Sequence, residues 1–188
     1  MIIGYHVIFG TYGFWLPNDP RGSWSDFVWS WELFRFGGKA TKVETRRSVA
    51  ADTHNVTKRL EAKRHLKYPP VVFTGKQALA VAHGFARAVE ISEHPVFACS
   101  ILPEHVHLVF GRCRFDIEKV VRQLKQNATI CLKEENAHPP AATPWGDSCW
   151  KVFLEDDESL CRAIRYVEEN PMKEGKKPQR WSFVRDIV

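Results

Sequence analysis

The sequence predicts an α+β fold with an antiparallel sheet and helices on one face of it. The first observation is the order of the expected elements: strand, long insertion, helix, strand, strand, helix, strand and helix. Without the insertion and the last helix this order is βαββαβ, the ferredoxin-like pattern. The second observation is periodicity. The expected strands are short β-branched and aromatic runs, and the expected helices repeat apolar residues at helical spacing.

Four segments have the composition of strands. The first is YHVIFGTY at residues 5–12, close to the N-terminus. Two more lie at 96–100 and 105–110, and the turn residues between them, at 102–104, predict a β-hairpin. The fourth is WKVFL at 150–154.

Capping residues and apolar stripes define the two helices that complete the pattern. Thr74 and Gln77 form a T-x-x-Q capping box, which satisfies two amide donors at the start of the first helix. Asp116 can cap the second helix. Each helix then has one apolar face, made in the first by Ala78, Val81, Ala82, Phe85, Ala88 and Val89, and in the second by Ile117, Val120, Val121, Leu124, Ala128 and Leu132.

The length suits one domain, which we expect to span residues 1–188. Residues 13–70 show little periodicity and read as an insertion after the first strand, and residues 175–188 read as a basic tail. The insertion opens with a cluster of turn residues. It also holds tryptophans that we expect to be mainly packing residues, namely Trp24, Trp29 and Trp31.

Composition narrows the class of protein and its environment. The formal net charge of +5 and the pI of about 9.0 make an anionic partner such as nucleic acid plausible. The five cysteines are an odd number without a CxxC pair, which argues against a zinc ribbon or a disulfide framework and favours a reducing cytoplasm. We find no signal-peptide pattern and no apolar run of the roughly 18 residues that a membrane span needs, so no membrane partner is expected.

Two histidines lie one residue apart in the expected strand PEHVHLVF. Because side chains alternate along a strand, His105 and His107 share one face, and Val106 and Leu108 take the other face, against the helices. Neighbouring imidazoles on one face can share a divalent transition metal or, with added oxygen ligands, Mn²⁺ or Mg²⁺. The alternative is a pair of solvent-facing strand histidines without a shared task.

The last expected helix carries a tyrosine and an asparagine one turn apart. Asp156 or Asp157 can cap it, and we expect it to end at Asn170, because Pro171 disfavours a helical residue before it. Tyr166 lies off the buried stripe, and Asn170 shares its face. The alternative is a surface tyrosine with an unrelated asparagine at the helix end.

These two motifs together resemble a known family. The sequence HVH at 105–107 resembles the His-hydrophobic-His motif of the HUH endonucleases, and RYVEENP at 165–171 resembles the tyrosine helix of their single-tyrosine transposases. The resemblance covers roughly residues 5–12 and 72–175. The tryptophan-rich insertion and the basic tail are similar to those of the REP-associated tyrosine transposases.

The resemblance implies a site and a reaction. Tyr166 is implied as the nucleophile, and His105, His107 and Asn170 as ligands of Mg²⁺ or Mn²⁺. The implied activity is metal-dependent cleavage and joining of single-stranded or hairpin DNA through a 5′-phosphotyrosine intermediate. A homodimer stays open, as does the question of which subunit's tyrosine serves which histidines.

Basic residues provide candidate DNA contacts, since positive charge with aromatic rings suits single-stranded DNA. The candidates on the second helix are Lys119, Arg122 and Lys125, and those in the tail are Lys176, Lys177 and Arg180 beside Trp181. Further positive charge gathers in the insertion, at Lys39, Lys42, Arg46, Arg47, Lys58, Arg59, Lys63 and Arg64.

Glu104 and His6 are two further candidates for this site. We interpret Glu104 as a turn residue or a residue that supports the metal ligands, and not as a ligand itself. We interpret His6 as an ordinary strand histidine, although it would lie beside the site if the first strand were central. One alternative function is a regulator that binds structured DNA without cutting it. The other is a metal phosphoesterase that uses water as its nucleophile.

Overall fold

The computed structural model describes residues 1–14, 16, 33, 35, 55–141, 143–147 and 149–186. Within them, four strands form one sheet in the order β2-β3-β1-β4, and all neighbours are antiparallel. This is the predicted ferredoxin-like sheet. The strands are β1 (Gly4–Gly10), β2 (Val96–Ile101), β3 (His105–Gly111) and β4 (Trp150–Leu154).

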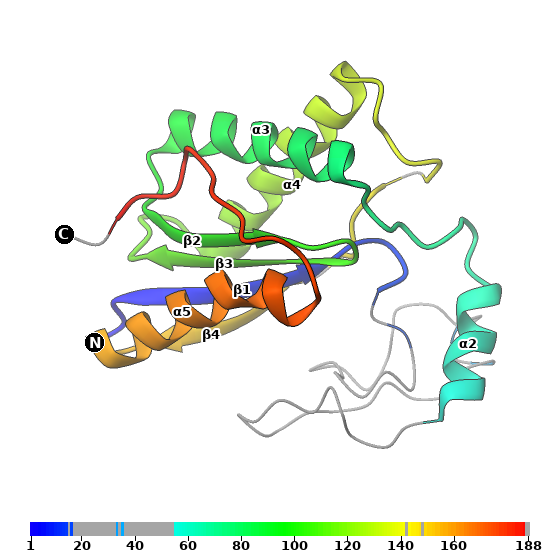
Figure 1. Ribbon diagram of the computed structural model, residues 1–188, viewed down its shortest axis with the longest axis horizontal. Helices are drawn as coiled ribbons and strands as arrows, with labels where there is room; N and C mark the ends of the chain where they lie inside the picture. The colour runs from blue at the N-terminus through cyan, green and yellow to red at the C-terminus, as the bar shows by residue number, and fades with distance from the viewer. Residues whose placement is uncertain are drawn as a thin grey trace.

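The helices lie on both sides of this sheet (Figure 1). The two helices of the βαββαβ pattern, α3 (Gly75–Ser92) and α4 (Ile117–Glu134), cover one face, as predicted. The last helix, α5 (Asp157–Lys173), packs against the opposite face through a smaller apolar cluster. The short helix α2 (Val56–Arg64) lies inside the segment predicted to be an insertion.

Alternation along β3 divides the sheet into an apolar face and a face with polar side chains. Val106, Leu108 and Phe110 are fully buried in the main core, against α3 and α4. His105, His107 and Val109 therefore face α5. The side of the sheet predicted for the two histidines is confirmed.

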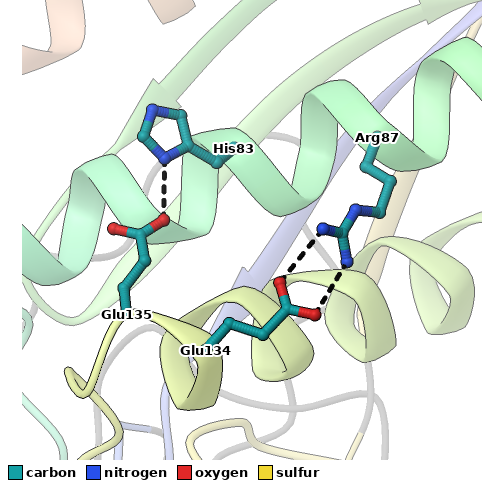
Figure 2. Close-up of polar contacts among 4 residues, drawn as sticks. All are labelled: His83, Arg87, Glu134 and Glu135. Atoms are coloured by element: carbon teal, nitrogen blue, oxygen red, sulfur yellow. Dashed lines mark hydrogen bonds and ion pairs between the residues drawn. The ribbon is translucent and has the colours of Figure 1, made fainter.

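A capping box starts α3, and polar side-chain contacts link α3 to the end of α4. Thr74 and Gln77 form the predicted capping box at the start of α3. Further along, His83 of α3 contacts Glu135 just after α4, with 2.8 Å between Nδ1 and Oε1 (Figure 2). Arg87 makes two contacts with Glu134, at 3.0 and 3.4 Å. These pairs are exposed, so the buried apolar faces between the helices contribute more to stability.

The prediction that α5 ends at Asn170 was wrong. The helix continues to Lys173 with Pro171 inside it, because the proline removes only one amide donor and its ring is buried. The helix then closes at Gly175, which has a φ of 68°. The N–H of Gly175 donates to the carbonyl of Met172, and the N–H of Lys176 donates to the carbonyl of Pro171. Asp156, one of the two predicted caps, accepts a hydrogen bond from the backbone N–H of Ser159.

The tail covers the edge of the sheet at β2. The side chain of Gln179 makes two hydrogen bonds of 2.8 Å with the backbone N–H and carbonyl of Ile101. The N–H of Arg185 donates to the carbonyl of Val96, also at 2.8 Å. Phe183 is buried in the main core. The tail thus pairs an edge strand that would otherwise present open backbone groups.

Several predictions fall on residues that the structure does not describe. Trp24, Trp29 and Trp31 lie outside the described residues, as do Lys39, Lys42, Arg46 and Arg47 of the basic stretch. The division into one domain with an insertion at 13–70 and a tail at 175–188 stays a prediction. None of the described helices is long and apolar enough to span a bilayer.

Candidate active site

Three histidines meet on the face of the sheet beneath α5. His105 and His107 lie on β3, with ring centroids 4.9 Å apart. His6 comes from β1, the neighbouring central strand, and its Nε2 lies 3.1 Å from Nδ1 of His107. His6 is paired with Val109 across the two strands, so it is a diagonal neighbour of His107 and within reach of its ring. The site therefore contains a third imidazole, because β1 is central.

Burial keeps the two deeper imidazoles in the neutral form. Burial lowers the pKa of His6 from its ordinary value of 6.5 to about 4. The pKa of His107 lies well below 6.5, first because of burial and then because of the charges of His105 and His6. A neutral imidazole keeps one nitrogen lone pair available. Both rings can therefore accept a hydrogen bond, and His107 can serve as a metal ligand.

Helix α5 supplies a row of side chains above these histidines. Tyr166, Asn170 and Glu174 are spaced four residues apart, so they lie along one face of the helix and its C-cap. The ring of Tyr166 lies 5.6 Å from that of His107 and 5.7 Å from that of His6, between centroids. At the other end, a carboxylate oxygen of Glu174 lies 3.7 Å from Nε2 of His105. Along this face of the helix, Asn170 therefore lies between Tyr166, which contacts His107 and His6, and Glu174, which contacts His105.

Tyr166 and Asn170 differ in burial in a way that suits different tasks. Tyr166 is 41% exposed, which leaves it open to a large substrate. Asn170 is only 7% exposed, and its Nδ2 atom is buried without a hydrogen-bond partner. A buried amide without a partner is uncommon and calls for an explanation.

The orphaned amide of Asn170 fits a metal site. Rotation of the amide by half a turn exchanges its oxygen and nitrogen, so the unpaired position can equally hold a carbonyl oxygen. One amide oxygen with two imidazole nitrogens is a donor set that suits Mn²⁺. Within the described part of the chain, no group of three or more His, Cys, Asp or Glu side chains could hold a metal ion. The predicted site therefore depends on Asn170 as well as His105 and His107.

The ring of His105 is held in place by a residue that follows β1. Phe14 stacks on it, with 4.9 Å between ring centroids and 20° between ring planes. Gly10, which is paired with His105 across the strands, makes room for that stack. A Cβ atom on Gly10 would lie 2.6 Å from a ring carbon of Phe14.

Other polar groups near the site were not among the predicted residues. Lys173 places its ammonium 4.7 Å from the centroid of the Tyr166 ring and pairs with Glu169 at 3.2 Å. Ser100 is paired with His107 across β2 and β3, and its hydroxyl is buried without a partner. Lys173 could have been found from its helical spacing to Tyr166. Glu174 was missed because the helix was expected to end earlier.

The predicted DNA-contacting residues are spread over both sides of the sheet. Lys119 and Arg122 are exposed on α4, across the sheet from the histidines. Lys125 differs from them, because its Nζ donates to the carbonyl of Gly146 at 2.7 Å and lies 5.1 Å from the Phe9 ring. Their contact with DNA stays a prediction.

The tail residues are closer to the end of α5. Lys176, Lys177 and Arg180 are exposed, and the first two follow Gly175 directly. Trp181 is half-buried against the main core, and its indole nitrogen is buried without a partner. It therefore packs in this structure, and its stacking on DNA stays a prediction.

Glu104, interpreted as a turn residue, lies in the turn between β2 and β3. Its carboxylate accepts a hydrogen bond from Lys63 of α2 at 3.4 Å. Its backbone carbonyl accepts hydrogen bonds from both the N–H and the hydroxyl of Thr11. These contacts fix the turn just before His105.

Comparison with known proteins gives a family match. The family model described as "Transposase IS200 like" matches residues 64–170. No curated protein matches the chain.

Two solved structures match most of the chain. One is titled "Structure of the REP associates tyrosine transposase bound to a REP hairpin", is 12% identical, and has a TM-score of 0.49 over 99% of this chain and 93% of that one. The other, from Deinococcus radiodurans R1, is named only provisionally as a transposase. It is 13% identical, with a TM-score of 0.42 over 90% of this chain and 91% of that one.

Proposed function

The chain belongs to the IS200-like transposase family, and from this premise we propose that it is a metal-dependent endonuclease and strand transferase for single-stranded DNA. The oxygen of Tyr166 attacks the scissile phosphorus, and the bond from phosphorus to the 3′-oxygen breaks. The products are a 5′-phosphotyrosine and a free 3′-hydroxyl, which takes up the proton that the tyrosine loses. Because the phosphotyrosine is itself a phosphate diester, a 3′-hydroxyl can attack it, release the tyrosine and rejoin DNA.

The observation that carries this proposal is the position of Tyr166. Its ring is exposed and contacts both His107 and His6, which are neutral and buried. Tyrosine is a weak nucleophile at its ordinary pKa of about 10 and needs help to lose its proton. Tyr166 is exposed, and the histidines beside it are shielded from water. This arrangement suits attack of the tyrosine oxygen on a phosphate held beside the histidines.

Each residue of the site has a separate task. His105, His107 and Asn170 would hold Mg²⁺ or Mn²⁺, which when bound polarises the scissile phosphate as a Lewis acid. Phe14 orients the ring of His105 by stacking on it. Lys173 places positive charge beside Tyr166, which favours the negative charge that the tyrosine oxygen carries as it attacks.

Tyr166 lies beside the histidines of its own chain, which supports a site in which one chain supplies both. The homodimer stays an open prediction. The substrate that we propose is single-stranded DNA beside a hairpin, with the exposed basic residues of α4 and the tail as contacts to phosphates.

The test is a covalent adduct. The protein is incubated with Mn²⁺ and end-labelled single-stranded hairpin DNA, and adducts are separated on a denaturing gel. The control is Tyr68→Phe, a change at a tyrosine that follows α2 and packs against Tyr12. We expect an adduct with the wild type and with this control, and none with Tyr166→Phe. An adduct that persists in Tyr166→Phe would show that another group is the nucleophile.

Two further outcomes separate the alternatives. If DNA is cleaved without forming an adduct, and Tyr166→Phe still cleaves it, the protein is a phosphoesterase that uses water as its nucleophile. Tight DNA binding without any cleavage by the wild type, with either metal, would indicate a regulator. We expect His105→Ala to lose cleavage and to keep most of its DNA binding, because a metal ligand contributes less to binding than the basic surface does.

A further inference from the structure

The contact between His6 and His107 has an unusual geometry. Nε2 of His6 and Nδ1 of His107 are 3.1 Å apart, and the ring planes are only 26° from parallel. The ring centroids are 5.3 Å apart, which exceeds the nitrogen separation by about the width of one imidazole ring. The two nitrogens therefore lie on the line between the rings, and the rings meet edge to edge.

This geometry excludes a metal ion shared by these two atoms. A nitrogen ligand points its lone pair at the metal, with a bond of about 2.0–2.1 Å for zinc. Two nitrogens that point at each other across 3.1 Å leave no room for an ion between them. The distance is instead that of a hydrogen bond, with one proton shared on the line between the nitrogens.

The remaining question is which ring donates. If His6 donated, His107 would carry its own proton on Nε2 and would have no lone pair left for a metal. If His107 donates from Nδ1, its Nε2 is free. Ligating histidines in metal sites commonly donate their other ring N–H in this way, which fixes both tautomer and orientation.

We propose that His6 is a positioning residue that accepts a hydrogen bond from Nδ1–H of His107 and so presents the Nε2 lone pair of His107 to the metal. This inference rests on the proposed function, because it assigns His6 a task at the same site. The central position of β1 makes the contact possible. His6 is paired with Val109 on one side and Val152 on the other, and its ring is packed beside Tyr166.

The tautomer can be observed directly, without metal or DNA. Long-range ¹H–¹⁵N correlation spectra of the full chain show which ring nitrogen of His107 carries the proton. We expect the proton on Nδ1 and a bare Nε2 in the wild type. We expect His6→Gln to keep this tautomer, because its amide oxygen can accept the bond, and His6→Phe to lose it. A wild-type His107 with its proton on Nε2 would overturn the proposal.

Metal affinity gives a second readout and separates this inference from the proposed function. We expect His6→Phe to weaken Mn²⁺ binding about 10- to 100-fold, and His6→Gln to stay within a few-fold of the wild type. If His6→Phe and the wild type bind Mn²⁺ with equal affinity, His6 does not position His107. If His105→Ala also binds Mn²⁺ as tightly as the wild type, the metal site itself is wrong, and the spectra still decide which ring donates.

Discussion

Tyr166 is surrounded by groups that act on it from different sides. Two neutral imidazoles contact its ring from the sheet, and the ammonium of Lys173, two helical turns further along α5, lies 4.7 Å from the ring centroid. The imidazoles bring no positive charge while they stay neutral, whereas Lys173 places an ammonium over the ring. The electrostatic help that the nucleophile needs can therefore be tested at a single residue.

We predict that Lys173→Met slows formation of the covalent adduct about two- to five-fold, the rate equivalent of an exposed cation–π contact of 0.5–1 kcal/mol. The measurement is the single-turnover rate of adduct formation with saturating DNA. The matched control is Glu169→Gln, which removes the ion pair with Lys173 but keeps the ammonium. If Glu169→Gln slows the reaction as much as Lys173→Met does, the ion pair matters and not the charge beside Tyr166.

Between elements, the orientation of His105 depends on a close approach between β1 and the residues that follow it. Phe14 can stack on His105 only because residue 10 has no side chain. We predict that Gly10→Ala displaces the ring of Phe14 and lowers the free energy of unfolding by about 1–3 kcal/mol, the usual cost of overpacking. We also expect weaker Mn²⁺ binding, because His105 loses its stacking partner. Urea denaturation and metal titration measure the two effects.

A second glycine provides the control for this experiment. Gly75 lies at the start of α3, and nothing lies within 4 Å of an added Cβ. Gly75→Ala should therefore raise the free energy of unfolding by about 0.4–1 kcal/mol and leave metal binding unchanged. A Gly10→Ala protein as stable as the wild type, with unchanged metal affinity, would show that Phe14 does not hold His105.

At the scale of the whole molecule, local signals predicted most of the fold. The capping box at Thr74 and the alternation of HVH between two faces depend on residues close in the sequence. Such signals specify which elements form and which side chains share a face. The order of the elements then predicted the sheet, because few arrangements fit βαββαβ.

What could not be predicted depends on contacts between distant segments. The role of His6 requires the register of β1 against β3, which joins residues about a hundred positions apart. Glu174 was missed because the cost of Pro171 inside a helix is offset by burial and by the closing turn at Gly175. Lys119 and Arg122 lie across the sheet from the histidines because α4 covers the opposite face of the sheet. Helical spacing alone does not predict this.

Lys125 connects three parts of the structure and has a charge that the fold disfavours. It belongs to α4, donates to Gly146 in the loop before β4, and lies over Phe9 of β1. Burial lowers its pKa from 10.5 to about 8, although the charges of Cys149 and Asp147 act in the opposite direction. The folded protein therefore releases this proton at a lower pH than the unfolded chain does.

This difference predicts how stability depends on pH. Below about pH 8 both states carry the proton, and the full penalty for the buried charge is present. Between about pH 8 and 10.5 only the unfolded state keeps it, so the free energy of unfolding should rise with pH, by at most about 1.4 kcal/mol per unit. Lys125→Met should lack this rise, and the exposed control Lys119→Met should keep it. The measurement is urea denaturation at intervals from pH 7.5 to 10.5, read as the difference between each variant and the wild type, since cysteines titrate in the same range. Parallel curves for Lys125→Met and the wild type would show that the Lys125 ammonium is as well solvated in the fold as in the open chain.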